Sequence, residues 1–175
     1  MILSSHIITA SAVVAPLLNK PLSFTNATLI FFVSFLSHFA LDALPHWDYK
    51  MLSFTKENGE RQFIFKKYFS TKDFLKNLLD GATGLAGAIL IIGFPKDFSE
   101  FILFGLIVFG SILPDALEAT YAINKYRFLE PLHKFHLAIH GRRIFQNRPF
   151  LGVISQILIL ILIVLFLIDF EKFDF

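Results

Sequence analysis

Cysteine is absent from this 175-residue chain, and charged side chains are scarce. The lack of cysteine excludes disulfides, thiolate metal ligands and cysteine nucleophiles, and it leaves the redox compartment open. Charged residues make up 17% of the chain, below the roughly 25% of a soluble domain, which indicates a membrane protein. The net charge of +2, without a basic patch interleaved with aromatic residues, argues against nucleic-acid binding. The first residues lack the basic region of a cleavable signal peptide, so the first apolar segment is expected to be retained.

Apolar segments are abundant, and five of them approach the length of about 20 residues that a spanning helix needs. They are residues 2–18, 27–44, 74–94, 101–119 and 150–170. Gly81, Gly84 and Gly87 in the third segment suit close helix packing. The fifth segment has few polar residues, among them Ser155 and Gln156, and is expected to face lipid as an anchor. The sequence predicts one all-α domain over residues 1–175, an integral membrane bundle of about five transmembrane helices. Short cytoplasmic amphipathic helices are expected in the polar segments 49–73 and 121–149.

Alternating passage of five spans through a bilayer would bring every histidine and every intramembrane carboxylate to one face. Thirteen of the sixteen basic residues fall on the same face, and the other three are Lys20, Lys96 and Lys172. By the positive-inside rule, this face is cytoplasmic. We therefore expect a protein of the cell membrane with a cytoplasmic N-terminus and a site on the cytoplasmic face.

The densest group of candidate metal ligands surrounds the end of the second apolar segment. His38 and Asp42 are four residues apart and share one face of a helix. His46 and Asp48 follow in an extended stretch, where alternation points them the same way. The alternative is an interfacial belt around Trp47, but His38 and Asp42 lie deeper in the apolar segment and need partners.

Two further segments carry candidate residues. Asp115 follows Pro114 near the end of the fourth apolar segment and is expected to bind a metal, with Glu118 as a second ligand or general base. The alternative is a helix-end charge paired with a basic residue. Histidines also recur at helical spacing in the second polar segment, where an amphipathic surface helix is the alternative: His133, His136 and His140.

Arg142 and Arg143 follow these histidines and suit an anionic substrate group, or they are ordinary positive-inside residues. His6 and Asp80 are further candidate site residues, because alternating passage of the five spans places them on the same face as the other histidines. Asp80 could also pair with Lys76, four residues earlier.

Together these motifs resemble the membrane-bound, metal-dependent hydrolase family typified by YdjM. Those proteins combine an early Gly-His, a Leu-Pro-Asp near a helix end, a His-rich segment and a Ser-His-x-x-x-Asp on an apolar helix. Here Ser replaces the early Gly, the order of the motifs differs, and the His-rich segment lacks the family's Thr-His-Ser. The matching residues are Ser5-His6, Leu113-Pro114-Asp115, residues 136–140, and Ser37-His38 with Asp42. A fainter similarity is to zinc-dependent phospholipase C, whose site also mixes His and Asp on helices.

The resemblance implies a metal-dependent hydrolase, and His and Asp ligands suit zinc, with manganese or magnesium as alternatives. We expect one or two ions and hydrolysis of a phosphoester or related bond in a membrane lipid or lipid-linked substrate. Glu118 or Asp48 would serve as the catalytic base. A divalent-metal or proton-coupled transporter, and a non-enzymatic membrane protein with a structural metal site, are the alternative functions. The oligomeric state is not indicated.

Overall fold

The structure is a computed structural model, which describes residues 2–57, 60–70, 72–140, 145 and 147–171. Side chains at 56–63, 65, 70 and 166–171 lie outside that description. The predicted all-α class is confirmed, with one short β-hairpin added. In chain order the elements are α1 (Leu3–Val14), η1 (Ala15–Leu17), α2 (Phe24–Asp42), β1 (Phe54–Glu57), β2 (Glu60–Phe63), α3 (Phe65–Ser70), α4 (Asp73–Ile92), α5 (Phe98–Asn124), η2 (Arg127–Leu129), α6 (Glu130–Ile139) and α7 (Pro149–Glu171).

Each of the five predicted apolar segments forms a helix. Three of them, α2, α4 and α5, are long and apolar enough to cross a membrane. α1 and η1 together cover 3–17, about 22 Å of helix at 1.5 Å per residue, which is short of a bilayer core of about 30 Å. α1 gives way to a 3₁₀ turn at Ala15, beside Pro16, whose ring nitrogen has no hydrogen to donate. α7 is helical over 23 residues.

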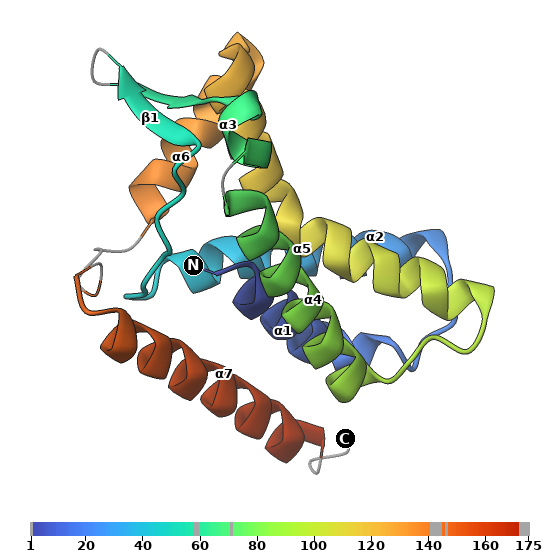
Figure 1. Ribbon diagram of the computed structural model, residues 1–175. Helices are drawn as coiled ribbons and strands as arrows, with labels where there is room; N and C mark the ends of the chain where they lie inside the picture. The colour runs from blue at the N-terminus through green and yellow to red at the C-terminus, as the bar shows by residue number, and fades with distance from the viewer. Residues whose placement is uncertain (1, 58–59, 71, 141–144, 146, 172–175) are drawn as a thin grey trace.

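α1 is the central helix, and it packs against α2, α4, α5 and α7 (Figure 1). The contact with α4 is the closest, because a Cβ on Gly84 would lie 2.8 Å from Ile7 Cδ1 and 2.9 Å from Ser4 Cα. A Cβ on Gly87 would lie 2.6 Å from Ile8. The predicted role of these glycines in close helix packing is therefore confirmed at Gly84 and Gly87.

The buried apolar core lies beside the second half of α1, between α1, α2 and α5. It consists of Ala10, Val14, Ile30, Leu103 and Ile107. Leu17, Leu18 and other partly buried apolar side chains pack around it. This half of the bundle is thus filled with hydrocarbon, and the polar groups gather toward the other end, where α1 begins.

At that end α5 changes direction near its internal Pro114 and extends away from the bundle (Figure 1). A proline interrupts the hydrogen-bond ladder of a helix, so a bend there has a local cause. The last turns of α5 meet α6 and the β1–β2 hairpin, and together with α3 these elements form what we call the polar cap. α6 carries Pro131 in its first turn, where the missing N–H has no consequence.

α7 does not behave as a purely lipid-facing anchor. Gln156 is buried. Its Nε2 donates to the Trp47 carbonyl at 2.7 Å, and its Oε1 accepts from Ser5 Oγ at 3.3 Å. One turn earlier, Gly152 is also buried, and a Cβ there would lie 2.2 Å from that of Trp47. One face of α7 is therefore docked on the bundle, because an amide in an apolar helix needs hydrogen-bond partners.

Candidate metal centre

Asp42, at the C-terminal end of α2, is the centre of the site. Its Oδ1 lies 3.3 Å from Nε2 of His6 on α1. Its Oδ2 lies 3.2 Å from Nε2 of His38, one turn earlier on α2, and 2.8 Å from Nε2 of His136 on α6. Asp42 and all three histidines are buried. Three helices therefore direct imidazole nitrogens at one carboxylate, as the helical spacing of His38 and Asp42 predicted for that pair.

Two of the histidines are oriented by backbone carbonyls. Nδ1 of His38 lies 2.7 Å from the Ser111 carbonyl oxygen on α5, and Nδ1 of His46 lies 2.7 Å from that of Leu44. Each Nδ1 must carry a hydrogen to donate to a carbonyl, which leaves Nε2 with a lone pair directed into the site. An outer hydrogen bond of this kind is typical of metal-binding histidines, because it sets the tautomer and the ring orientation.

The hydrogen bonding of the buried imidazoles is incomplete. Among the described residues, neither ring nitrogen of His6 has a hydrogen-bond partner, and neither does Nε2 of His38 or His46. Unpaired buried polar atoms are costly. Two ligands bound tetrahedrally to zinc at about 2.0–2.1 Å are roughly 3.3–3.4 Å apart. The contacts of His6 and His38 with Asp42, 3.3 and 3.2 Å, match this separation.

Asp115 lies at the open side of the cluster. Its Oδ1 is 3.7 Å from Nε2 of His38, and its side chain is 45% exposed, whereas that of His38 is fully buried. Asp115 directly follows Pro114, the proline inside α5. One accessible carboxylate therefore lies beside buried imidazoles, so the cluster can be reached from outside at Asp115.

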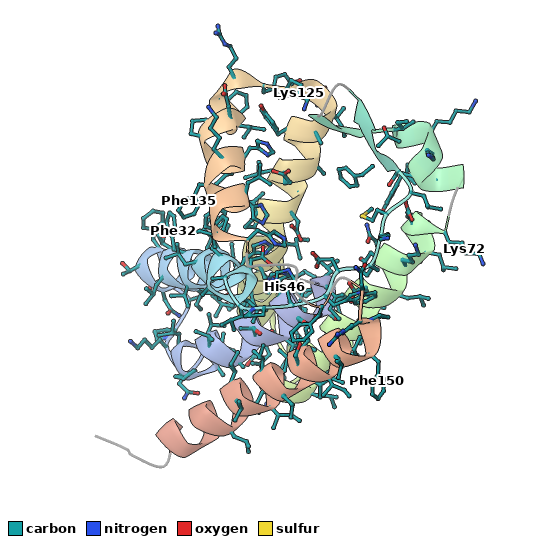
Figure 2. All side chains as sticks on the ribbon, turned by 90° about the vertical axis from the view of Figure 1, so that its left-hand side faces the viewer. Phe32, His46, Lys72, Lys125, Phe135 and Phe150 are labelled. Atoms are coloured by element: carbon teal, nitrogen blue, oxygen red, sulfur yellow. The ribbon has the colours of Figure 1, made fainter. Side chains whose placement is uncertain are left out.

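A second part of the cluster comes from the loop after α2. Nε2 of His46 lies 3.4 Å from Oδ2 of Asp48, so the two side chains point the same way, as alternation predicted. The ring of His140, at the end of α6, lies 4.7 Å from that of His46 with the ring planes tilted by 48°, and its Nε2 is 3.8 Å from Oδ2 of Asp48. Figure 2 shows His46 near the middle of the molecule, beneath the polar cap.

The local environment changes the protonation of the groups in the loop and on α6. Burial opposes ionisation of Asp48, but the adjacent His46 imidazole outweighs it and holds the pKa of Asp48 well below its usual range. Burial lowers the pKa of His140 to about 4. Burial also disfavours the charged form of His136, but the hydrogen bond to Asp42 outweighs it and raises the pKa of His136. Near neutral pH, Asp48 is therefore an anion and His140 a neutral imidazole, the forms that bind metals.

Among the residues that the structure describes, these His and Asp side chains form three overlapping groups, each of which could hold a metal ion. In each group the ligand atoms lie within 4.8 Å of one another. The groups are His6–His38–Asp115, His38–Asp42–His136 and Asp42–His46–His140. A neutral imidazole has a single acceptor nitrogen and serves one ion, whereas the two oxygens of Asp42 can serve two. Asp42 belongs to two of the groups, and each of those groups could hold a metal ion.

Two of the other predicted site residues form a pair of their own. Oε2 of Glu118 lies 2.7 Å from Nδ1 of His133, whose ring stacks on Tyr121 at 4.3 Å between centroids. Glu118 is one helical turn from Asp115, and His133 is one turn from His136. This pair lies outside the three groups, so the predicted histidine stripe is divided between two structures, and His140 sits where α6 ends.

Asp80 caps a helix, whereas the sequence suggested a site residue or a partner of Lys76. Its carboxylate accepts hydrogen bonds from the backbone N–H groups of Leu3 at 2.7 Å and Ser4 at 3.1 Å, so it caps the start of α1. The Lys76 ammonium that could have paired with it contacts Asp73 at 3.3 Å instead. Asp80 thus holds the helix that carries His6, two residues beyond Ser4.

Arg142 and Arg143, the predicted substrate-binding residues, lie outside the described residues. Sequence reasoning missed the Ser111 carbonyl that orients His38, because any residue type can supply a backbone oxygen. It also missed the docking of Gln156, although an amide within an apolar helix was a usable signal.

Comparison with known proteins adds no assignment. The chain matches no protein-family model, no curated protein and no solved structure.

Proposed function

We propose that this protein is a membrane-embedded hydrolase that uses two divalent metal ions, preferably zinc, to cleave a phosphoester or related bond of a membrane-associated substrate. The observation that carries the proposal is Asp42, a buried carboxylate contacted by imidazoles from three helices. Nitrogen and carboxylate ligands without thiolates suit zinc, and manganese or magnesium is the alternative.

A pair of ions of this kind supplies Lewis acidity toward water and toward the oxygens of the scissile group. The protein's own groups have separate tasks. His38 and His46 present Nε2 inward because carbonyls hold their Nδ1 hydrogens. Asp115 lies at the exposed edge, where a substrate can approach. Glu118 and His133, hydrogen-bonded one turn away, can accept a proton from water and pass it to solvent.

The expected orientation of the bundle in the membrane is consistent with this function. The positive-inside rule assigns the end with the metal centre and the polar cap to the cytoplasm. Arg142 and Arg143, which follow the last histidine, would bind the anionic group of the substrate. The resemblance to the YdjM-like hydrolases suggests the same reaction class.

The two alternative functions are less consistent with the fold. A transporter needs a polar path through the membrane, whereas the far half of the bundle is closed by Val14, Ile30, Leu103 and their apolar neighbours. A purely structural metal site is sealed by protein ligands, whereas Asp115 is 45% exposed. Both observations favour catalysis at the cytoplasmic end.

Metal analysis of the purified full-length chain tests the proposal. After chelation and reloading with zinc, we expect about two ions per chain, and fewer in Asp42→Asn and Asp115→Asn. Asp115→Asn is the more tolerant variant, because its side chain is partly exposed. His133→Gln is the matched control, since it removes a histidine outside the three groups and should keep both ions.

Hydrolysis is then measured on the loaded protein with p-nitrophenyl phosphate and with phosphatidic acid in detergent micelles. We expect phosphate release that disappears with chelator and in Asp115→Asn. A wild-type protein without bound metal would overturn the whole proposal. Two tightly bound ions with no hydrolysis of either substrate would contradict the proposed phosphoester hydrolysis and favour a structural centre.

A further inference from the structure

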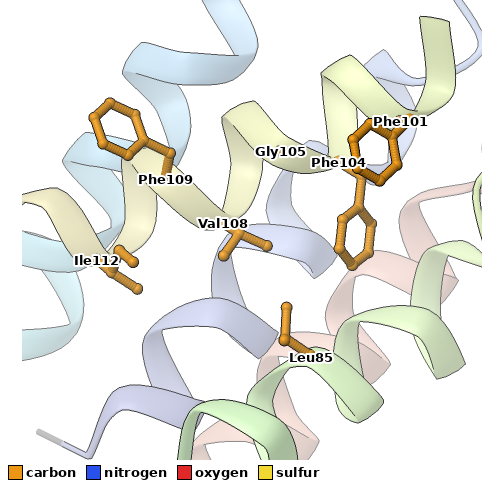
Figure 3. Close-up of a pocket in the computed structure, with 7 residues that line it drawn as sticks. All are labelled: Leu85, Phe101, Phe104, Gly105, Val108, Phe109 and Ile112. Atoms are coloured by element: carbon orange, nitrogen blue, oxygen red, sulfur yellow. The ribbon is translucent and has the colours of Figure 1, made fainter. Parts of the chain in front are cut away.

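An apolar groove lies between α4 and α5 (Figure 3). Its wall on α5 runs from Phe101 to Ile112 and includes Gly105 and Val108, while Leu85 of α4 stands on the other side. The volume is about 350 Å³, which falls within the range of roughly 300–1,000 Å³ for ligand pockets.

The groove follows from the spacing of residues on α5. Phe101, Gly105, Val108 and Ile112 recur at intervals of three or four residues, so they share one face of the helix. A Cβ added to Gly105 would meet no atom within 4 Å, so the middle of the groove is open. The neighbouring helices do not fill this space, because α4 and α5 each pack on α1.

The dimensions match one leaflet of a membrane. Ile112 lies eleven positions after Phe101, about 16 Å along a helix, which is close to half of a bilayer core of roughly 30 Å. α5 is itself long and apolar enough to span. The medium beside this groove in a membrane is therefore hydrocarbon, and a single extended lipid chain fits its length.

The groove leads to the metal centre. Asp115 follows Ile112 by one helical turn, and it is the exposed carboxylate of the cluster. A molecule that occupies both places needs a hydrocarbon chain and a polar group at one end. A soluble phosphoester has only the polar group, and an apolar metabolite has only the chain.

We propose that the α4–α5 groove holds one hydrocarbon chain of a phosphate-bearing membrane lipid, with the polar end of the chain at Ile112 and the phosphate at Asp115. This assignment rests on the proposed function and narrows it, since the substrate is then a lipid drawn from the leaflet next to the metal centre. The terminal part of the chain lies near Phe101.

Photo-crosslinking of the full-length protein in phosphatidylcholine vesicles tests the assignment. Two phosphatidic acid probes are used, one with a diazirine near the carboxyl end of an acyl chain and one with a diazirine near its methyl end. Peptide mapping should find the first probe around Ile112 and Asp115, and the second around Phe101. The measurement is made on metal-free and on zinc-loaded protein.

Gly105→Leu fills the open middle of the groove without a clash and should lower labelling there about tenfold, the effect of excluding roughly two methylene groups. Ala86→Leu is the matched control, because it adds similar bulk at an exposed position of α4 outside the groove lining. It should leave the labelling unchanged.

Labelling spread evenly over the exposed faces of α2, α4 and α5, or unchanged in Gly105→Leu, would show annular lipid only and overturn the assignment. Crosslinks that place a second copy of the chain in the groove, or a reversed order of the two probes, would also overturn it. Groove labelling of the metal-free protein does not depend on hydrolysis, so a failure of the proposed function is distinguished from a failure of the groove.

Discussion

Asp80 connects the stability of the fold to the geometry of the metal centre, and its replacement gives a quantitative test. The first N–H groups of a helix have no partner within it, and Ile2, at the N-cap of α1, supplies no side-chain acceptor. Asp80 supplies the acceptors from α4, because its two oxygens accept from Leu3 N and Ser4 N. Tyr49 also donates to it, at 3.3 Å. Its negative charge stands at the positive end of the helix dipole.

The expected loss in Asp80→Ala is about 1–3 kcal/mol of unfolding free energy. Removing a helix cap costs about 1 kcal/mol and up to about 2, and the interaction of a charge with the helix dipole adds about 0.3–1. For a chain of this size the loss corresponds to a Tm lower by roughly 2–12 °C. The first turn of α1 would also lose its fixed position, so His6 would bind metal less well, by about 10- to 100-fold as for other supporting residues of metal sites.

Thermal unfolding in detergent, followed by the fluorescence of the single Trp47, measures the first effect, and competition with a zinc-binding dye measures the second. Asp97→Ala is the control, because Asp97 caps the start of α5, at the other end of the bundle, through Glu100 N at 2.9 Å. It should lower stability by about 1 kcal/mol without changing zinc affinity. An Asp80→Ala protein that melts like the wild type, or that binds zinc equally well, would refute the reasoning.

Two further predictions concern helix packing and pH. Gly84→Val should separate α1 from α4 and lower the free energy of unfolding by about 1–3 kcal/mol, measured by thermal unfolding. Gly105→Val, at an open position, should not lower it. Equal melting temperatures of the two variants would contradict the close packing at Gly84. Zinc affinity should fall as pH decreases from about 8 to about 5, because the raised pKa of His136 lets protons compete early, while the low pKa of His140 delays competition there. A dye competition series measures this, and an affinity independent of pH over that range would contradict it.

The helices were predictable because a single local property decides them. A long apolar segment in hydrocarbon must satisfy its backbone internally, so residues such as Phe98–Asn124 form a helix whatever surrounds them. The spacing of His38 and Asp42 is equally local, since residues four apart on a helix are neighbours. Their contact at 3.2 Å could therefore be anticipated from the chain alone.

The assignment of each polar residue to a task was less predictable. Asp80 and Asp42 are both carboxylates near the ends of apolar segments, yet one caps a helix and the other meets three imidazoles. Glu118 on α5 contacts His133 on α6. These outcomes depend on which side chain of a neighbouring helix comes within hydrogen-bond distance, and no spacing within one segment encodes that.

The sequence by itself determined that the protein is helical and apolar, and that the histidines and carboxylates of its candidate site lie toward one end, because hydrophobicity and helical periodicity act over a few residues. Only the tertiary structure decided that Asp42 is the carboxylate contacted by three imidazoles, that Asp115 is the exposed carboxylate beside them, and that a groove on α5 leads to it. Those features depend on how α1, α4 and α6 approach one another, and contacts between residues 77 or 94 positions apart arise only when the whole chain has packed.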